Sequence, residues 1–254
     1  MTMLERNQLI DFLQTELQTD SIKDYCPNGL QVEGKHAIKK IVTGVTASQA
    51  LIDAAITAQA DAILVHHGYF WKGEAAEITG MKKRRLQSLL QHDINLLAYH
   101  LPLDVHPTLG NNAQLGKLMK LQNITPLMAL EPKGIVMQGN FAAEQTASQV
   151  QLQLEQLLKR KVLLHQGGES KITKVAWCTG GGQGYIEQAV TAGAQLFITG
   201  EVSEQTIHVS RELGIHFIAA GHHATERYGI KALGEYVAQH FAVDVEFIDI
   251  DNPA

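Results

Sequence analysis

The feature that most constrains the fold is an internal repeat. The segment TAQADAILVHH at 57–67 is matched 134 residues later by TAGAQLFITGE at 191–201. A second match joins DINLLAYH at 93–100 to GIHFIAAGH at 214–222, with one extra residue near its end. The first match has an Ala-rich helix end followed by a short apolar strand, a pattern that also arises by chance. The acidic and histidine ends of the matched segments favour a genuine duplication.

The predicted elements alternate along the chain. Helices are expected over 4–18, 48–59 and 83–92, and buried strands over 40–45, 62–65 and 94–99. This alternation is typical of an α/β fold whose mainly parallel sheet is covered on both faces. A different pattern, with a helix at 149–160 capped by Thr146 or Ser148, opens the second half. We therefore predict two similar α/β domains, 1–125 and 126–254. The first contains His66, His67 and Asp104 and the second contains His222 and Glu226, the residues considered below as possible metal ligands.

Composition narrows the class of protein. The 254 residues carry 21 Lys and Arg against 26 Asp and Glu, a net charge of −5, which argues against a protein built mainly to grip nucleic acid. No apolar run reaches the length of a membrane-spanning helix, and the amphipathic N-terminus is no signal peptide. Two cysteines, Cys26 and Cys178, are too few for a disulfide framework. These features predict a cytoplasmic protein with no membrane partner.

Histidine is unusually frequent, with twelve in the chain, and this directs attention to metal binding. His66 and His67 directly follow the apolar strand AILV. The carboxyl ends of parallel strands form the crevice in which α/β folds bind ligands. Neighbouring residues of an extended chain point to opposite sides, so the two imidazoles are expected to serve two different ions.

Two further strand ends carry possible ligands. In YHLPLD, His100 and Asp104 lie four residues apart, and Pro102 predicts a loop there rather than a helix. In GHHATERYG, His222 and Glu226 are one helical turn apart and face the same way. Imidazoles mixed with carboxylates suit zinc, manganese, iron or nickel better than magnesium or calcium.

Three other features have weaker patterns. Glu201 occupies the repeat position of His67, so it is expected to point towards the same crevice as an acid that contacts a metal ligand. Glu201 and His100 are the two candidate catalytic residues. The GGGQG loop at 180–184 either forms a tight turn or holds phosphate at a helix N-terminus. Phe70 and Trp71 either pack against the histidine pair or stack on a nucleotide base.

Together these motifs resemble a known family. LVHHGYFW, AYHLPLD, ITGEVSE, AAGHHATERYG and FIDIDNPA, with NGLQVEG near residue 28, are similar to those of the GTP cyclohydrolase 1 type 2 homologues, or NIF-three-like proteins. The resemblance implies a duplicated α/β fold, two divalent metal ions per subunit and a toroidal homohexamer. It implies that the metal ligands are His66, His67, Asp104, His222 and Glu226. Glu226 would bridge the two ions, and His100 would lie beside them or act as an occasional ligand.

Two functional hypotheses follow. The first is a metal-dependent hydrolase in which two ions activate a water against a small molecule, with a GTP cyclohydrolase-like reaction on a nucleotide as one form. The second is a non-catalytic metal-binding scaffold or regulatory protein that presents a surface to a protein or nucleic-acid partner.

Overall fold

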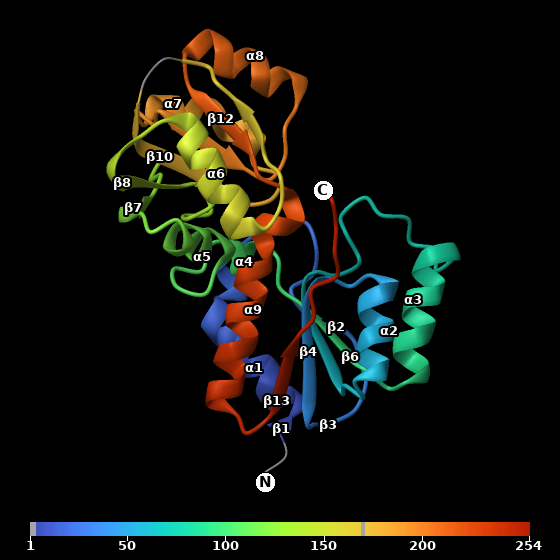
Figure 1. Ribbon diagram of the computed structural model, residues 1–254. Helices are drawn as coiled ribbons and strands as arrows, with labels where there is room; N and C mark the ends of the chain where they lie inside the picture. Colours follow the sequence, from blue (N-terminus) through green and yellow to red (C-terminus); the bar gives the residue numbers. More distant parts are fainter. Residues whose placement is uncertain (1–3, 169–170) are drawn as a thin grey trace. The chain divides into compact units, whose positions relative to one another are not determined.

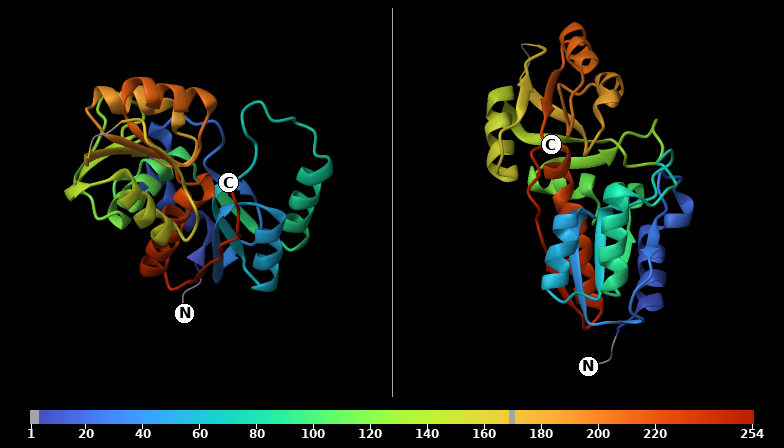
Figure 2. Two further views of the ribbon diagram at one scale, coloured as in Figure 1. Left: turned by 45° about the horizontal axis from the view of Figure 1, so that its top comes forward. Right: turned by 90° about the vertical axis from the view of Figure 1, so that its right-hand side faces the viewer.

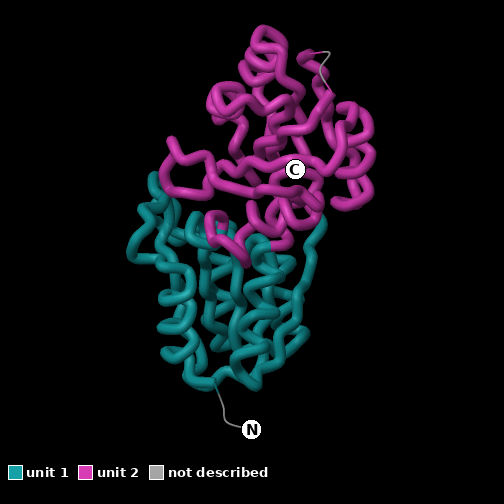
Figure 3. Tube along the Cα trace, turned by 90° about the vertical axis from the view of Figure 1, so that its left-hand side faces the viewer, with its two compact units in different colours: residues 1–103, 229–251 teal, residues 104–228, 252–254 magenta. Residues whose placement is uncertain are grey.

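The computed structural model describes residues 4–168 and 171–254, and the chain divides into two compact units (Figures 1 and 3). Unit 1 comprises Met1–Leu103 with Gly229–Asp251, and unit 2 comprises Asp104–Tyr228 with Asn252–Ala254. These bounds differ from the predicted division at 125/126. The reason is that the C-terminal strand pairs with a strand from the start of the chain, so the end of the chain returns to unit 1.

Unit 1 contains a five-stranded sheet. Its order is β13 (Asp244–Phe247), β4 (Lys40–Thr46), β5 (Ala62–His67), β6 (Asn95–Ala98) and β2 (Gly29–Val32). The first four strands are parallel, and β2 runs antiparallel to β6. The short strands β1 (Leu4–Glu5) and β3 (Ala37–Ile38) form a separate antiparallel pair. The expected parallel α/β sheet is therefore present.

Helices cover both faces of this sheet. The helices α2 (Gln49–Thr57) and α3 (Gly80–Gln91) lie on one face, and α1 (Arg6–Leu17) lies on the other with the part of α9 (His222–His240) that belongs to unit 1 (Figures 1 and 2). Alternate strand residues such as Ile63 and Val65 pack against α2 and α3 in one buried cluster. On the opposite face, a Cβ added at Gly234 would lie 2.7 Å from Thr43 Cγ2, so glycine lets α9 approach β4 closely.

Unit 2 contains a six-stranded sheet. Its order is β7 (Gln122–Pro126), β8 (Met137–Gln145), β10 (Ile172–Cys178), β11 (Leu196–Thr199), β12 (His216–Ala219) and β9 (Leu163–His165). The central strands β10, β11 and β12 are parallel, and the flanking pairs are antiparallel. One face is covered by α5 (Asn111–Leu118) and α6 (Ala147–Leu158), and the other by α7 (Ile186–Thr191) and α8 (Glu204–Leu213).

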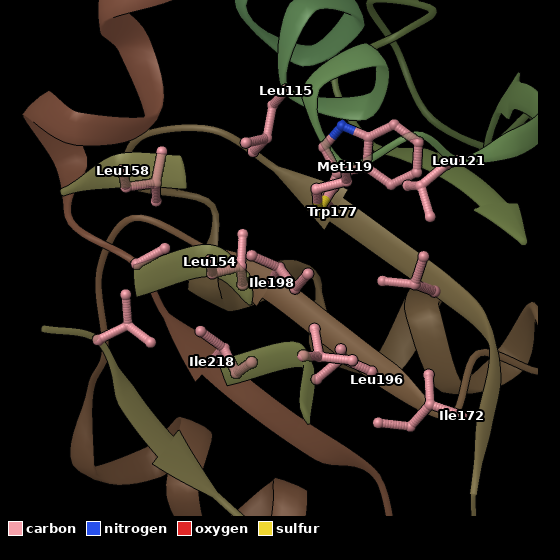
Figure 4. Packing of buried hydrophobic residues seen from close by; sticks show 14 of the residues in the cluster. Leu115, Met119, Leu121, Leu154, Leu158, Ile172, Trp177, Leu196, Ile198 and Ile218 are labelled. Carbon is pink, nitrogen blue, oxygen red and sulfur yellow. The ribbon is translucent and has the colours of Figure 1, made fainter. Parts of the chain in front are cut away.

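The core of unit 2 lies between its sheet and α5 and α6. Figure 4 shows Trp177, near the end of β10, packed near Leu115 and Met119, with Leu154 near Ile198. The indole Nε1 of Trp177 donates a hydrogen bond of 2.9 Å to the carbonyl of Asn112, so this buried polar group is satisfied. The buried residues of α6 recur every three or four positions, at Ala147, Val150, Leu154 and Leu158, so one face of the helix packs on this core.

The repeat seen in the sequence is reproduced in the strand register. Ile41 of β4 pairs with Ala62 of β5, and 134 residues later Val175 of β10 pairs with Leu196 of β11. Both units therefore contain the same β-α-β-α-β arrangement, β4-α2-β5-α3-β6 in unit 1 and β10-α7-β11-α8-β12 in unit 2. This agreement of register supports a duplication of the α/β unit.

The start of the second strand is also alike in the two units. Asp61 Oδ2 accepts hydrogen bonds from the backbone N–H groups of Lys39 and Lys40, at 2.8 and 3.2 Å. At the matched position, Gln195 Oε1 accepts from the backbone N–H groups of Thr173 and Lys174, both at 2.8 Å. A charged acceptor in unit 1 and a neutral one in unit 2 thus perform the same structural task.

Three local expectations are settled by the structure. The prediction of a loop at YHLPLD was wrong, because Leu101–Asp104 forms the short helix α4 with Pro102 in its first turn, where proline is tolerated. The cap of α6 is Thr146, in a capping box with Gln149. Cys26 and Cys178 are buried free thiols. Among the residues described, the helices are all too short or too polar to span a membrane.

Candidate metal centre

Unit 1 gathers three histidines at the carboxyl ends of two neighbouring strands. His66 and His67 are the last residues of β5, and His100 follows β6. Ring centroids lie 4.4 Å apart for His66 and His67, 5.2 Å for His66 and His100, and 5.8 Å for His67 and His100. One ring nitrogen from each lies within 4.8 Å of the others, a spacing that can hold a metal ion. The two neighbouring imidazoles thus lie close together at the end of β5, and their service to two different ions stays a prediction.

Hydrogen bonds orient two of these imidazoles. Nδ1 of the fully buried His66 lies 3.0 Å from the carbonyl oxygen of Tyr99, which can only accept, so Nδ1 carries the proton and Nε2 the lone pair. Nδ1 of His67 lies 3.2 Å from Thr46 Oγ1. Anchoring through Nδ1 is the usual way in which a protein presents Nε2 of histidine to a metal.

Sequence reasoning missed two residues beside His100. Asp24 Oδ1 lies 2.7 Å from His100 Nδ1, and Asn28 Oδ1 accepts a hydrogen bond of 2.8 Å from the backbone N–H of His100. Both residues lie in the loop before β2, more than seventy positions away in sequence. Burial alone would raise the pKa of Asp24, but hydrogen bonds from His100 and Asn28 outweigh it and lower the pKa to about 2. Asp24 is therefore an ionised carboxylate at neutral pH.

In unit 2 the first turn of α9 brings an imidazole between two carboxylates. Nε2 of His222 lies 3.2 Å from Glu226 Oε2, and Nδ1 of His222 lies 2.7 Å from Glu201 Oε1. The predicted one-turn spacing of His222 and Glu226 is thus present, and Glu201 contacts His222 as expected from its repeat position. Burial opposes protonation of His222, but Glu226 and Glu201 raise its pKa to about 9.

Asp104 occupies a buried polar pocket of unit 2. Its Oδ1 accepts a hydrogen bond of 2.8 Å from Asn111 Nδ2 and lies 3.4 Å from Thr179 Oγ1. Asp104 is 5% exposed and Glu226 is 2% exposed. Burial and the negative charges of Asp104 and Glu226 raise the pKa of the Cys178 thiol, which therefore stays protonated. Two buried carboxylates near one thiol concentrate negative charge, an environment that favours a bound cation.

Glycines make room for this carboxylate cluster. A Cβ added at Gly180 would clash with the Glu226 carboxylate, and one added at Gly200 would lie 2.6 Å from both Gly180 O and His222 Cα. Two amides of the 180–184 loop are used within the fold, because Gly180 N donates to Thr225 Oγ1 and Gly182 N donates to Thr199 Oγ1. These contacts favour the tight turn over the phosphate site for GGGQG.

The aromatic residues after the histidine pair both make packing contacts, but with different partners. Trp71 lies edge-on to His100 with ring centroids 4.9 Å apart, and its centroid is 6.0 Å from that of His67. Its indole Nε1 donates to Gly68 O at 3.2 Å. Phe70 is 37% exposed and packs with Tyr69 and the Lys82 ammonium. Trp71 is thus part of the histidine cluster, and Phe70 lies outside it.

The donor sets of the two units fit the chemistry of a divalent transition metal. Unit 1 supplies imidazole nitrogens whose orientation is fixed by hydrogen bonds, and unit 2 supplies buried carboxylate oxygens next to an imidazole. Imidazole nitrogens and carboxylate oxygens are both donors that zinc, manganese, iron and nickel accept. A duplicated α/β fold with histidine and carboxylate clusters at its strand ends therefore defines a class of candidate metal-binding proteins.

Comparison with known proteins gives the family. The family model of Duf34/NIF3 (NGG1p interacting factor 3) matches residues 4–253, and the chain belongs to this family. It is 58% identical to a GTP cyclohydrolase 1 type 2 homolog of Haemophilus influenzae over the full length of both chains. It is 57% identical to the homolog of the same name from Yersinia pestis, over 97% of this chain and 98% of that one.

A solved structure confirms the fold. The protein ybgI, described as of unknown function, superposes with a TM-score of 0.95 at 51% identity, covering 99% of this chain and 100% of that chain. The predicted resemblance to the NIF-three-like family and its α/β fold are therefore confirmed.

Proposed function

We propose that the protein is a metal-dependent hydrolase of a small molecule and that each subunit binds two divalent transition-metal ions. The ligands in this proposal are His66, His67, Asp104, His222 and Glu226, with Glu226 shared between the ions. The observation that carries it is the cluster of three imidazoles at the ends of β5 and β6, in which the Nδ1 of His66 is held by the carbonyl of Tyr99.

The chain's own residues suit hydrolysis. When bound, two dications would supply Lewis-acid activation of water and of the bond under attack. His100, oriented by Asp24, and Glu201, which contacts His222, would hold or move protons. Trp71 beside His100 would give an aromatic face against which a nucleotide base can stack. A GTP cyclohydrolase-like reaction on a nucleotide is the form that we put first for testing.

The enzyme proposal is tested by turnover. Protein loaded separately with zinc, manganese, iron or nickel should be incubated with GTP, other nucleotides, phosphodiesters and small amides, with product analysis by mass spectrometry. We expect turnover of at least one substrate class, and we expect it to be lost in His66→Ala. The control is His92→Ala, which changes an exposed histidine at the end of α3 and should keep the turnover. Metal binding without turnover of any substrate would contradict the enzyme proposal and favour the non-catalytic scaffold.

The family resemblance also leads us to propose a toroidal homohexamer, since closed symmetry is the usual outcome for soluble homo-oligomers. Native mass spectrometry at low micromolar concentration should give six times the 27.9 kDa chain mass. A stable monomer or dimer would contradict the ring and leave the ligand proposal unchanged, since all five ligands come from one chain.

A further inference from the structure

The side chain of Asp24 is the most constrained carboxylate in unit 1. It is only 3% exposed, although it lies in a loop between α1 and β2. Its Oδ1 lies 2.6 Å from the backbone N of Tyr25 and 2.7 Å from His100 Nδ1. Its Oδ2 accepts hydrogen bonds of 2.9 Å from Asn28 Nδ2 and from the backbone N–H of Leu101.

These four contacts use the full capacity of the carboxylate. An ionised carboxylate accepts about four hydrogen bonds and donates none. Coordination of a metal by Asp24 would require at least one of these bonds to break. Cys26 lies in the same group of possible ligands as Asp24 and His100, but burial and the charge of Asp24 raise the pKa of its thiol to about 12. Asp24 and Cys26 therefore do not form the favoured metal site of this loop.

Because the carboxylate can only accept, the bond to Asp24 fixes the proton of His100 on Nδ1. The neutral imidazole then has its lone pair on Nε2. The backbone bonds from Leu101 N to Asp24 and from His100 N to Asn28 fix the same segment at two more points. Rotation of the imidazole would break a buried, charge-assisted hydrogen bond.

We propose that Asp24 is a positioning residue that holds His100 in the tautomer with Nε2 unprotonated, so that this nitrogen can act together with the imidazoles of His66 and His67. This proposal rests on the proposed function for what Nε2 does, namely bind a divalent cation or accept a proton from water. The positioning itself is a property of the protein without metal.

The other unit contains a partial counterpart. Glu201 Oε1 lies 2.7 Å from His222 Nδ1, the same distance and the same ring nitrogen as in the Asp24–His100 pair. Glu201 is 47% exposed in its side chain and accepts one further hydrogen bond, from Gln183 Nε2 at 3.2 Å. The carboxylate in unit 1 is thus held by more bonds and shielded from water, and we expect it to fix its histidine more firmly.

The first test uses metal-free protein. Solid-state NMR of the ¹⁵N-histidine-labelled full chain, at a pH where imidazoles are neutral, distinguishes protonated from unprotonated ring nitrogens. The His100 signals are assigned by their loss in His100→Gln. We expect wild-type His100 to be a single Nδ1–H tautomer. Asp24→Asn should give a mixture, Asp24→Glu should restore the single form, and the exposed control Asp20→Asn should match wild type.

The result that would overturn the positioning role is an Nε2–H tautomer in the wild type, or an unchanged tautomer in Asp24→Asn. The wild-type measurement decides even if Asp24→Asn fails to fold.

The second test uses Zn²⁺ alone as the probe. We expect Asp24→Asn to weaken zinc binding by about 10- to 100-fold and Asp20→Asn to leave it unchanged. Equal zinc affinity in wild type and Asp24→Asn would overturn the link between Asp24 and metal binding. If His100 has the Nδ1–H tautomer but no substrate is turned over, the proposed function is contradicted and the positioning role of Asp24 is not.

Discussion

The two units use one scaffold for different donors. The paired strands β4 and β5 have the same register as β10 and β11, and each second strand begins at a side-chain acceptor, Asp61 or Gln195. At the far end the units differ, because β5 ends in His66 and His67 while the matched positions after β11 are Gly200 and Glu201. The comparison teaches that strand-end chemistry can change while the sheet beneath it stays the same.

The largest expected effect concerns Gly200, the position matched to His66. Unit 1 accommodates an imidazole there, whereas in unit 2 a Cβ would meet the backbone of Gly180 and His222 at 2.6 Å. Gly200→Ala should therefore lower the free energy of unfolding by about 3 kcal/mol, measured by urea denaturation. Gly184→Ala is the control, since nothing lies near its added Cβ, and it should change stability by less than about 0.5 kcal/mol. Equal effects of the two changes would mean that unit 2 has space for a side chain at this strand end.

The next effect concerns Asp61, whose counterpart Gln195 does not titrate. Asp61→Asn should lower the free energy of unfolding by about 1–2 kcal/mol at neutral pH, because two backbone donors and Lys35 lose a charged acceptor. Burial alone would raise the pKa of Asp61, but hydrogen bonds from Lys35, Lys39 and Lys40 lower it.

The sign of the pH dependence follows from this lowered pKa. The stabilisation by Asp61 is fully present above the pKa of the unfolded chain, about 4, and is lost as the pH falls through the lower folded value. The gap in stability between wild type and Asp61→Asn should therefore shrink below about pH 4. Asp11→Asn, an exposed change in the same unit, should show no such trend. A gap that stays constant down to pH 2 would contradict the role of the Asp61 charge.

The smallest effect concerns helix caps. In unit 2, Ser203 Oγ accepts a hydrogen bond of 3.2 Å from Thr206 N at the start of α8. In unit 1, Thr79 precedes the matched helix α3 without a side-chain capping bond to any described residue. Ser203→Ala should therefore lower the thermal midpoint by the equivalent of about 1 kcal/mol, and Thr79→Ala should have almost no effect. A larger loss of stability in Thr79→Ala than in Ser203→Ala would contradict the expected difference between the two caps.

Much of the fold could be predicted from sequence because local patterns determine it. The apolar runs at 62–65 and 196–198 lie within strands β5 and β11, and the capping box of Thr146 marks the start of α6. Pro102 misled the prediction, since proline disfavours helix before it but is tolerated in a first turn. The unit bounds could not be predicted, because β13 returns to pair with β4 some two hundred residues earlier.

The candidate site also has contacts that could be predicted from local sequence spacing and contacts that could not. His222 and Glu226 are one turn apart on a helix, so their contact follows from local spacing. Asp24 gave no such signal, since it contacts His100 across 76 positions and only tertiary folding brings them together. The similar contacts of Asp24 and Glu201 could not be predicted from the internal repeat either. Glu201 follows a matched strand, whereas Asp24 lies in a loop before β2.

The measurement that most directly tests the account is the metal content of the purified protein. Inductively coupled plasma mass spectrometry should find about two transition-metal ions per chain in the wild type. Glu226→Gln should lose at least one ion, because a neutral amide cannot balance two dications, and the exposed control Glu204→Gln should lose none. An unchanged metal content in Glu226→Gln would contradict the shared carboxylate on which the proposed metal site depends.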